Sequence, residues 1–312
     1  MIKTISEKIF KVVFFLFLLS IFSFLIVKLA PGDPTMSMLR IDDIAVTKEE
    51  IANLKAQLGY DKPLLIQYFI WLSHVVRLDF GNSLITGQPA INTLLDAIPP
   101  TLEIMLGSII VTIIISLPLG IISALNPKGI INKISEVFVA VGSSMPAFFI
   151  GFLLVELFCV KLRILPSMGM GGIEYMILPS VTLGISMAPL YVKVIKSSIM
   201  ESKSKDFIKS AKARGIYSKR IFLFHILRDS LIPIITVFGL SLGSLMGGTV
   251  IIEVLFSYSG VGQLAMQAIT KRDYSVIQAF ILFTGICVFV INRIVDISYK
   301  FIDPSIRIKG GE

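Results

Sequence analysis

The chain has 312 residues, of which 54% are hydrophobic and only 16% are charged. A soluble chain holds about 45–50% apolar and about 25% charged residues, so this composition argues against a soluble globular enzyme and predicts a polytopic membrane protein. The net charge is +8, and both cysteines, Cys159 and Cys287, lie in apolar runs, so neither a disulfide framework nor a metal cluster is implied.

The first apolar stretch covers residues 10–29 and follows the basic residues Lys3 and Lys8. Its apolar core is longer than the roughly 7–15 residues of a cleaved signal peptide, and no small-x-small cleavage site follows it. Residues 1–30 are therefore predicted to form the N-terminus and an uncleaved first transmembrane helix. The next segment, residues 31–100, is polar and acidic, so we expect a small extracytoplasmic domain there.

Five further apolar stretches predict five more transmembrane helices, which make residues 101–300 the core of an all-α membrane protein with six spans. The stretches are residues 102–124, 137–160, 177–195, 231–255 and 276–297. Prolines lie within or at the ends of these stretches at Pro118, Pro146, Pro189 and Pro233. Because lipid cannot satisfy the carbonyls that proline frees, the spans are expected to pack against one another.

Lys and Arg collect in the connections that a six-span chain places on one side of the membrane. They occur after the second span at Lys128 and Lys133, in the loop between spans four and five, residues 197–230, and in the tail, residues 301–312. Positively charged connections stay in the cytoplasm, so both termini are predicted to be cytoplasmic. The basic loop also suits anionic lipid or RNA, but orientation accounts for its charge more simply.

Small residues recur every four positions in the fifth span, at Gly239, Gly243 and Gly247. They predict a ridge that lets another helix approach closely. The same run matches the Gly-x-Ser-x-Gly pattern of serine hydrolases, which requires a strand-to-helix turn and a nearby histidine. Because the match lies in the middle of a predicted helix, we discard a serine protease.

The chain contains no Gly-Lys dipeptide, so it lacks the phosphate-binding Walker A loop and any ATP-driven step needs a partner. A proton- or ion-coupled carrier would instead need ionisable groups at membrane depth. The candidates are Glu103, Glu156 and Glu253, which all fall near the ends of spans. An interfacial carboxylate is the simplest interpretation of each, and a place in the translocation path is the alternative.

The basic loop has the most specific local pattern. Asp206 is predicted to cap a short helix, Gly215 to end it, and a second helix to begin near Ser218. Phe207, Ile208 and Ala211 share one face by their spacing. The resulting helix–glycine–helix element either lies on lipid or fits a groove on another protein.

This element resembles the EAA coupling loop of binding-protein-dependent ABC importer permeases, through the runs DFIKSAKARG at residues 206–215, HILR at 225–228 and LIP at 231–233. Further segments resemble the dipeptide, oligopeptide and nickel branch of that family, namely residues 31–34, 58–64, 67–72, 79–83 and 248–253. Two positions depart from the family pattern. Ser259 stands where a proline is usual, and Asp229 replaces the commoner asparagine.

The resemblance implies the type I ABC importer permease fold, in which the loop docks into an ATP-binding subunit. Asp206, Ala211 and Gly215 would then shape the docking element. The residues expected to contact the partner are Phe207, Lys209, Lys212 and Arg214. This chain itself would have no catalytic site, no bound cofactor and no nucleic-acid partner, since ATP and Mg²⁺ are used by the partner subunits.

The same resemblance implies a bacterial cytoplasmic (inner) membrane protein that works with several partners. These are a second homologous permease subunit, two ATP-binding subunits and an extracytoplasmic substrate-binding protein, all assembled in membrane lipid. The rival class is an ion-coupled secondary carrier that works alone.

Residues 165–172 and 271–278 look closest to nickel permeases, so a nickel ion or chelate is the first expected substrate and a dipeptide or oligopeptide the second. The two histidines, His74 and His225, are too few for a dedicated nickel cage, and no metal site is expected. Met168 and Met170, at the predicted outer face, either contact a passing complex or serve as flexible packing.

Overall fold

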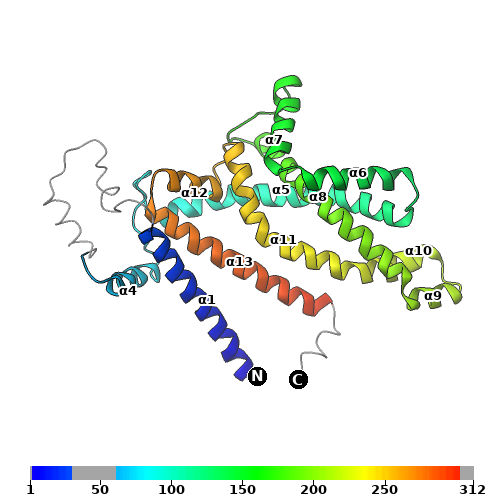
Figure 1. Cartoon of the computed structure of the whole chain (residues 1–312), viewed down its shortest axis with the longest axis horizontal. Coiled ribbons are helices and arrows are strands. Elements are labelled where there is room, and N and C mark those ends of the chain that lie inside the picture. Colours follow the sequence, from blue (N-terminus) through cyan, green and yellow to red (C-terminus); the bar gives the residue numbers. More distant parts are fainter. Residues whose placement is uncertain (1, 30–60, 303–312) are drawn as a thin grey trace. The chain divides into compact units, whose positions relative to one another are not determined.

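The computed structural model describes residues 2–29 and 61–302 (Figure 1). Within these ranges the regular structure is helical, apart from an isolated antiparallel bridge between Asn82 and Pro89. The prediction of an all-α fold is therefore confirmed. The expectations for residues 30–60 of the extracytoplasmic segment and for residues 303–312 of the tail lie outside the described residues.

The described residues form eleven α-helices. They are α1 (Ile2–Leu29), α4 (Leu64–Val75), α5 (Ala90–Leu125), α6 (Ile130–Ser144), α7 (Ala147–Val155), α8 (Ile173–Ser204), α9 (Asp206–Ala213), α10 (Ser218–Ile221), α11 (Leu227–Leu255), α12 (Val261–Thr270) and α13 (Tyr274–Ile302). Two π-helical turns, Glu156–Lys161 and Phe222–Ile226, extend α7 and precede α11.

Five helical segments of the described chain are long and apolar enough to cross a bilayer, and α6 with α7 makes a sixth if the pair counts as one span. Each overlaps one of the six apolar stretches of the sequence, although the fifth, Ser218–Gly243, begins and ends earlier than the predicted residues 231–255. An isolated helix of this length satisfies its own backbone hydrogen bonds, which is the condition for crossing hydrocarbon. The chain is therefore a multi-pass membrane protein.

The third predicted span, residues 137–160, is corrected by the structure to a bent pair. α6 begins at Ile130 and ends at Ser144, and α7 continues at 106° to it (Figure 1). Met145 is extended, with φ −94° and ψ 127°, a conformation that the ring of Pro146 favours in the residue before it. Pro146 thus contributes to the break, although Pro189 and Pro233 lie inside continuous helices.

The second predicted span begins earlier than expected. α5 starts at Ala90, inside the segment assigned to the extracytoplasmic domain, although its apolar stretch begins only at residue 102. Its first turns bury Ala90, Leu94 and Ala97, which recur at helical spacing among polar residues. The polar residues of these turns interrupt the apolar stretch, so the start of the helix could not be recognised from hydrophobicity alone.

The described residues divide into two compact units, which are considered separately. The first consists of the described part of Met1–Pro99 together with Gln263–Cys287. In it α1 packs on α4, where the hydroxyls of Ser20 and Tyr68 are 2.8 Å apart. The Trp71 indole N–H donates to the side-chain oxygen of Gln278 at 2.9 Å, which joins α4 to α13.

The second unit consists of Pro100–Gly262 and the described part of Val288–Glu312. Its central helix is α8, which packs against α6, α7 and α11. α5 also approaches α8 closely, because the Thr112 hydroxyl donates to the carbonyl of Gly184 at 3.2 Å. Small residues and interhelical hydrogen bonds hold helices together in lipid, because burying apolar side chains between helices there contributes little free energy of association.

The predicted glycine ridge of α11 is used at one position in this chain. A Cβ atom on Gly239 would lie 2.5 Å from both Cγ atoms of Val295 in α13, so only glycine permits this approach. At Gly243 the nearest atom, on Val288, would be 3.8 Å away, and at Gly247 no described atom would lie within 4 Å. The close helix contact is therefore confirmed for Gly239 alone.

Candidate functional site

The basic loop folds into α9, a glycine turn and α10, where α8 ends and α11 begins (Figure 1). The helix starts one residue earlier than predicted, because Lys205 takes the extended N-cap conformation, with φ −66° and ψ 148°. Asp206 is therefore the first helical residue rather than the cap. Its carboxylate accepts a hydrogen bond from Lys209 at 2.8 Å and lies at the positive end of the helix dipole.

Gly215 ends α9 as predicted. Its φ of +75° is left-handed, and its N–H donates to the Lys212 carbonyl at 2.9 Å. The N–H of Ile216 donates to the Ala211 carbonyl at 3.3 Å, which completes a Schellman motif. A Cβ atom on Gly215 would meet nothing within 4 Å, so the demand for glycine is conformational and not steric.

One face of α9 is buried against the helices of its unit. Ile208 and Ala211 belong to a cluster of buried side chains that includes Ile195 and Ile199 of α8 and Ile221 of α10. Phe207 does not join them, although its spacing in the sequence had placed it on the same face. A helix of eight residues is too short to persist alone, so this packing holds α9 in place.

The opposite face of α9 is exposed. Phe207 is 44% exposed, and the three basic residues expected to contact a partner, Lys209, Lys212 and Arg214, are exposed beside it. Tyr217, at 85% exposure, lies just after the glycine turn and was not singled out in the sequence. The signal in the sequence that could have identified Tyr217 as an interface residue is an aromatic residue directly after the predicted end of the helix. Aromatic and Arg side chains are typical anchors of protein interfaces.

Two lysines tie the loop to neighbouring helices. The Lys205 ammonium donates to both carboxylate oxygens of Asp229 in α11, at 2.7 and 3.0 Å. Lys203 donates to the carbonyl of Ala124 at 3.2 Å, where its charge complements the negative end of α5. Asp229, one of the two departures from the family pattern, therefore forms an ion pair with the N-cap residue of α9.

Glu253, one of the carboxylates predicted near the end of a span, lies fully buried beneath the turn that follows α11. Its oxygens accept hydrogen bonds from the Thr101 hydroxyl and from the backbone N–H of Gly262, both at 2.7 Å. A Cβ atom on Gly260 would come within 2.5 Å of this carboxylate, so the turn closes directly over it. The structure thus places Glu253 as a hydrogen-bonded support of the turn.

The same turn collects two more candidates. Glu103 accepts a hydrogen bond from the Tyr258 hydroxyl at 2.5 Å, and burial together with this bond raises the pKa of Tyr258. Met170 accepts a hydrogen bond at its sulfur from the Ser259 backbone N–H at 3.3 Å. A proline at position 259 would lack that N–H, so this contact can form only because Ser259 replaces the proline that is usual in the family.

The remaining candidates are exposed. Met168 is exposed in the connection between α7 and α8, and Glu156 lies 3.7 Å from Lys161 within its own π-helical turn. Among the described residues there is no group of three or more His, Cys, Asp or Glu side chains that would hold a metal ion.

Comparison with known proteins identifies relatives that match nearly the whole length of this chain. The family model of the binding-protein-dependent transport system inner membrane component matches residues 116–308, and that of the N-terminal membrane component of such systems matches residues 1–105. The chain is 34% identical over 310 residues to the nickel import system permease protein NikB of Staphylococcus aureus (strain MRSA252), covering 99% of this chain and 93% of that protein.

A second relative has a different substrate in its name. The chain is 33% identical over 299 residues to the probable peptide ABC transporter permease protein y4tP of Sinorhizobium fredii (strain NBRC 101917 / NGR234), covering 93% of this chain and 94% of that protein. Among solved structures, an inward-facing form of the MetNI methionine ABC transporter aligns with a TM-score of 0.57 and 18% identity, over 68% of this chain and 97% of that chain. This likeness shows a shared fold.

Proposed function

Because the chain belongs to the family of binding-protein-dependent transport system inner membrane components, and is the permease subunit of an ABC importer, we propose that residues 197–230 dock into separate ATP-binding subunits. The observation that carries this proposal is the two-faced structure of α9. Ile208 and Ala211 are buried in the helix bundle, while Phe207 and Arg214 face outward. Gly215 ends α9, so the exposed face of the helix ends at this residue.

A push on α9 is transmitted to the bundle through its buried contacts. Ile208 packs against α8, and Lys205 is paired with Asp229 at the start of α11. Since packed side chains resist compression, a rigid-body movement of α9 must move α8 and α11 with it. Closure of the ATP-binding subunits would thereby switch the permease between inward- and outward-open states.

The proposal includes the partners and the orientation. A second homologous permease, two ATP-binding subunits that use ATP and Mg²⁺, and an extracytoplasmic binding protein complete the importer. Both termini and the basic loop then face the cytoplasm of a bacterium. Of the proposed path residues, Glu103, Glu156, Met168 and Met170 line the outer end, and Glu253 supports the turn beside them.

The proposed cargo is a nickel ion or a nickel chelate. It is supported by the identity to the nickel permease of Staphylococcus aureus over 99% of this chain and by the nickel-permease-like segments 165–172 and 271–278. Selection would reside in the binding protein, because a path that the cargo only crosses needs no cage of histidines. A dipeptide or oligopeptide is the second candidate, favoured by the nearly equal identity to the peptide permease.

Docking is tested by two substitutions in the loop. Gly215→Pro is incompatible with φ +75°, since proline holds φ near −65°, and Ala211→Glu puts a carboxylate into a buried apolar cluster. We expect both variants to remain in the membrane but to lose ATP-dependent uptake in proteoliposomes that contain the whole importer. Gly87→Pro, at a glycine with φ +70° outside this loop, is the matched control for the proline substitution and should retain most uptake.

Normal uptake by both Gly215→Pro and Ala211→Glu would rule out docking through α9. Uptake by the permease alone, in liposomes without an ATPase, would instead establish the ion-coupled carrier. The cargo is tested separately by comparing radioactive nickel with a labelled dipeptide in the same proteoliposomes. Transport of the peptide without nickel would replace the proposed cargo and leave the docking proposal intact.

A further inference from the structure

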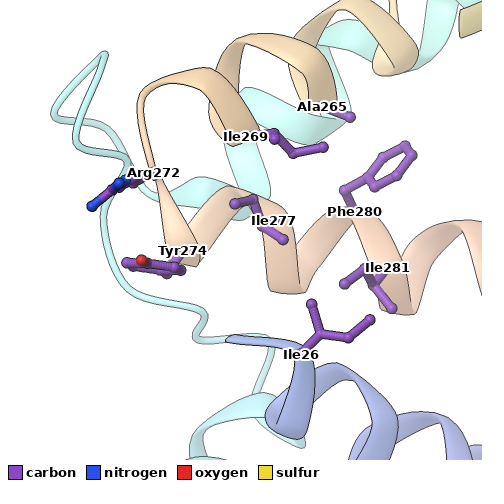
Figure 2. Close-up of a pocket in the computed structure, with 8 residues that line it drawn as sticks. All are labelled: Ile26, Ala265, Ile269, Arg272, Tyr274, Ile277, Phe280 and Ile281. Atoms are coloured by element: carbon purple, nitrogen blue, oxygen red, sulfur yellow. The ribbon is translucent and has the colours of Figure 1, made fainter. Parts of the chain in front are cut away.

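An apolar groove of about 480 Å³ lies between α1, α12 and α13. Figure 2 shows Ile26 of α1 facing Ile277 and Ile281 of α13, while Arg272 and Tyr274 lie at one end. All of these residues belong to the first compact unit. The groove is therefore lined almost entirely by apolar atoms, and the guanidinium of Arg272 lies beyond one end of it (Figure 2).

The groove lies where two membrane-spanning segments end. Ile26 is near the end of the apolar segment Phe10–Leu29, and Tyr274 is the first residue of the segment Tyr274–Val295. Beside it Ile269 of α12 is 55% exposed, so the outer wall of the groove is apolar as well. Acyl chains meet their head groups at this depth of a bilayer.

Arg272 occupies a backbone position that glycine usually takes. It follows the last turn of α12 with φ +54°, and the Schellman bonds run from its N–H to Ile269 and from the N–H of Asp273 to Ala268. A side chain is disfavoured in this conformation, which Leu78, Arg163 and Ser257 also adopt.

The neighbouring carboxylate, Asp273, does not form an ion pair with Arg272. Asp273 is fully buried, and one of its oxygens accepts hydrogen bonds from the Ser83 hydroxyl at 2.6 Å and the Leu84 N–H at 2.8 Å. Within the described part of the chain, no carboxylate forms an ion pair with Arg272. The guanidinium and the exposed Lys271 beside it are thus available to an anion from outside the chain.

We propose that this groove binds one acyl chain of an anionic phospholipid, whose phosphate is held by Arg272 with Lys271. The planar guanidinium fork matches two phosphate oxygens, and the isoleucine-lined groove takes the chain. A cationic end joined to an apolar trough complements a molecule with a phosphate head and a hydrocarbon tail. This site is independent of the docking of α9.

The test measures lipid binding to the full-length permease in mild detergent by native mass spectrometry. Dioleoyl phosphatidylglycerol should bind more tightly than dioleoyl phosphatidylcholine. Arg272→Gly should weaken phosphatidylglycerol binding roughly tenfold, the loss expected from one charge-assisted contact. Arg163→Gly is the matched control, because Arg163 has the same φ of +54° but lies outside the groove, and it should bind phosphatidylglycerol as the wild type does.

A second arm tests the acyl chain. Ile269→Asp places a carboxylate on the exposed edge of the groove and should also weaken phosphatidylglycerol binding, while glycerophosphoglycerol, the head group without chains, should bind at least about tenfold more weakly than the lipid. Equal binding of phosphatidylglycerol and phosphatidylcholine would contradict the proposed site. So would an equal loss of phosphatidylglycerol binding in Arg272→Gly and Arg163→Gly. So would loss of a co-purifying subunit from the Ile269→Asp complex with lipid binding unchanged, because the groove would then hold a protein helix.

Discussion

Asp229 illustrates how a single residue acquires a role that its sequence context does not reveal. In the sequence it stands only as a substitute for the commoner asparagine. In the structure its two carboxylate oxygens bind the Lys205 ammonium, and the two side chains are 26% and 41% exposed. Partial exposure keeps such a pair modest, at about 0.5–1 kcal/mol, but it lies at the junction of α9 with α11.

We therefore predict that Asp229→Asn lowers substrate-stimulated ATPase activity and uptake of the whole importer about two- to fivefold, the factor equivalent to about 0.5–1 kcal/mol, without lowering the amount of permease in the membrane. Exchange of the charges, with Lys205→Asp and Asp229→Lys together, should restore part of the loss. Glu136→Gln breaks an ion pair with Lys196 that joins α6 to α8, away from the junction of α9 with α11, and serves as the control. Equal coupling in Asp229→Asn and wild type would contradict the role of the pair.

At the scale of elements, α11 shows that equal spacing does not mean equal environment. Gly239 and Gly247 repeat at helical period, and the sequence treats them alike. Only Gly239 faces α13 closely, whereas no described atom lies within 4 Å of a Cβ at Gly247. In lipid the attraction between helices depends on this close packing, so the two glycines should respond differently to substitution.

Gly239→Ala is predicted to destabilise the permease by about 1–3 kcal/mol, because the added methyl collides with Val295 and α13 must move away. Gly247→Ala removes a glycine from the same helix without a collision within the chain and should be neutral or slightly stabilising. Thermal unfolding of the purified single chain in detergent measures both. A smaller loss for Gly239→Ala than for Gly247→Ala would show that α11 and α13 do not pack as described.

The whole molecule is organised by where its charges lie along the chain. The loop around α9 is basic, and the connection between α7 and α8 is held by contacts of Gly169 and Met170 to the turn after α11. In a six-span chain these two connections face opposite sides of the membrane. The positive-inside rule then predicts a cytoplasmic α9, as the proposed docking to an ATP-binding subunit requires.

This topology predicts opposite labelling of two exposed positions, Ser167 and Lys219. In a background with Cys159→Ala and Cys287→Ala, a membrane-impermeant maleimide should label Ser167→Cys in right-side-out vesicles. Lys219→Cys should be labelled only after the membrane is permeabilised. The reverse pattern would put the basic loop outside and remove the basis for docking.

Sequence alone was sufficient for properties that depend on local composition and period. The apolar stretches predicted the membrane-spanning helices, and the glycine at 215 predicted the end of α9, because helix formation and left-handed backbone geometry are set by a few neighbouring residues. The short helix α12 was missed. Its buried Val261, Ala265 and Ala268 recur at helical spacing, but ten residues are too few to span a bilayer.

Only the tertiary structure decided what each functional side chain contacts. It buried Glu253 under a turn with Thr101, paired Lys205 with Asp229, and brought Ile26 beside Ile277 in one groove. The members of each pair lie on different helices, and the angle and depth at which two helices meet depend on the packing of all side chains between them. A carboxylate or an arginine therefore has no defined environment until the helices have packed.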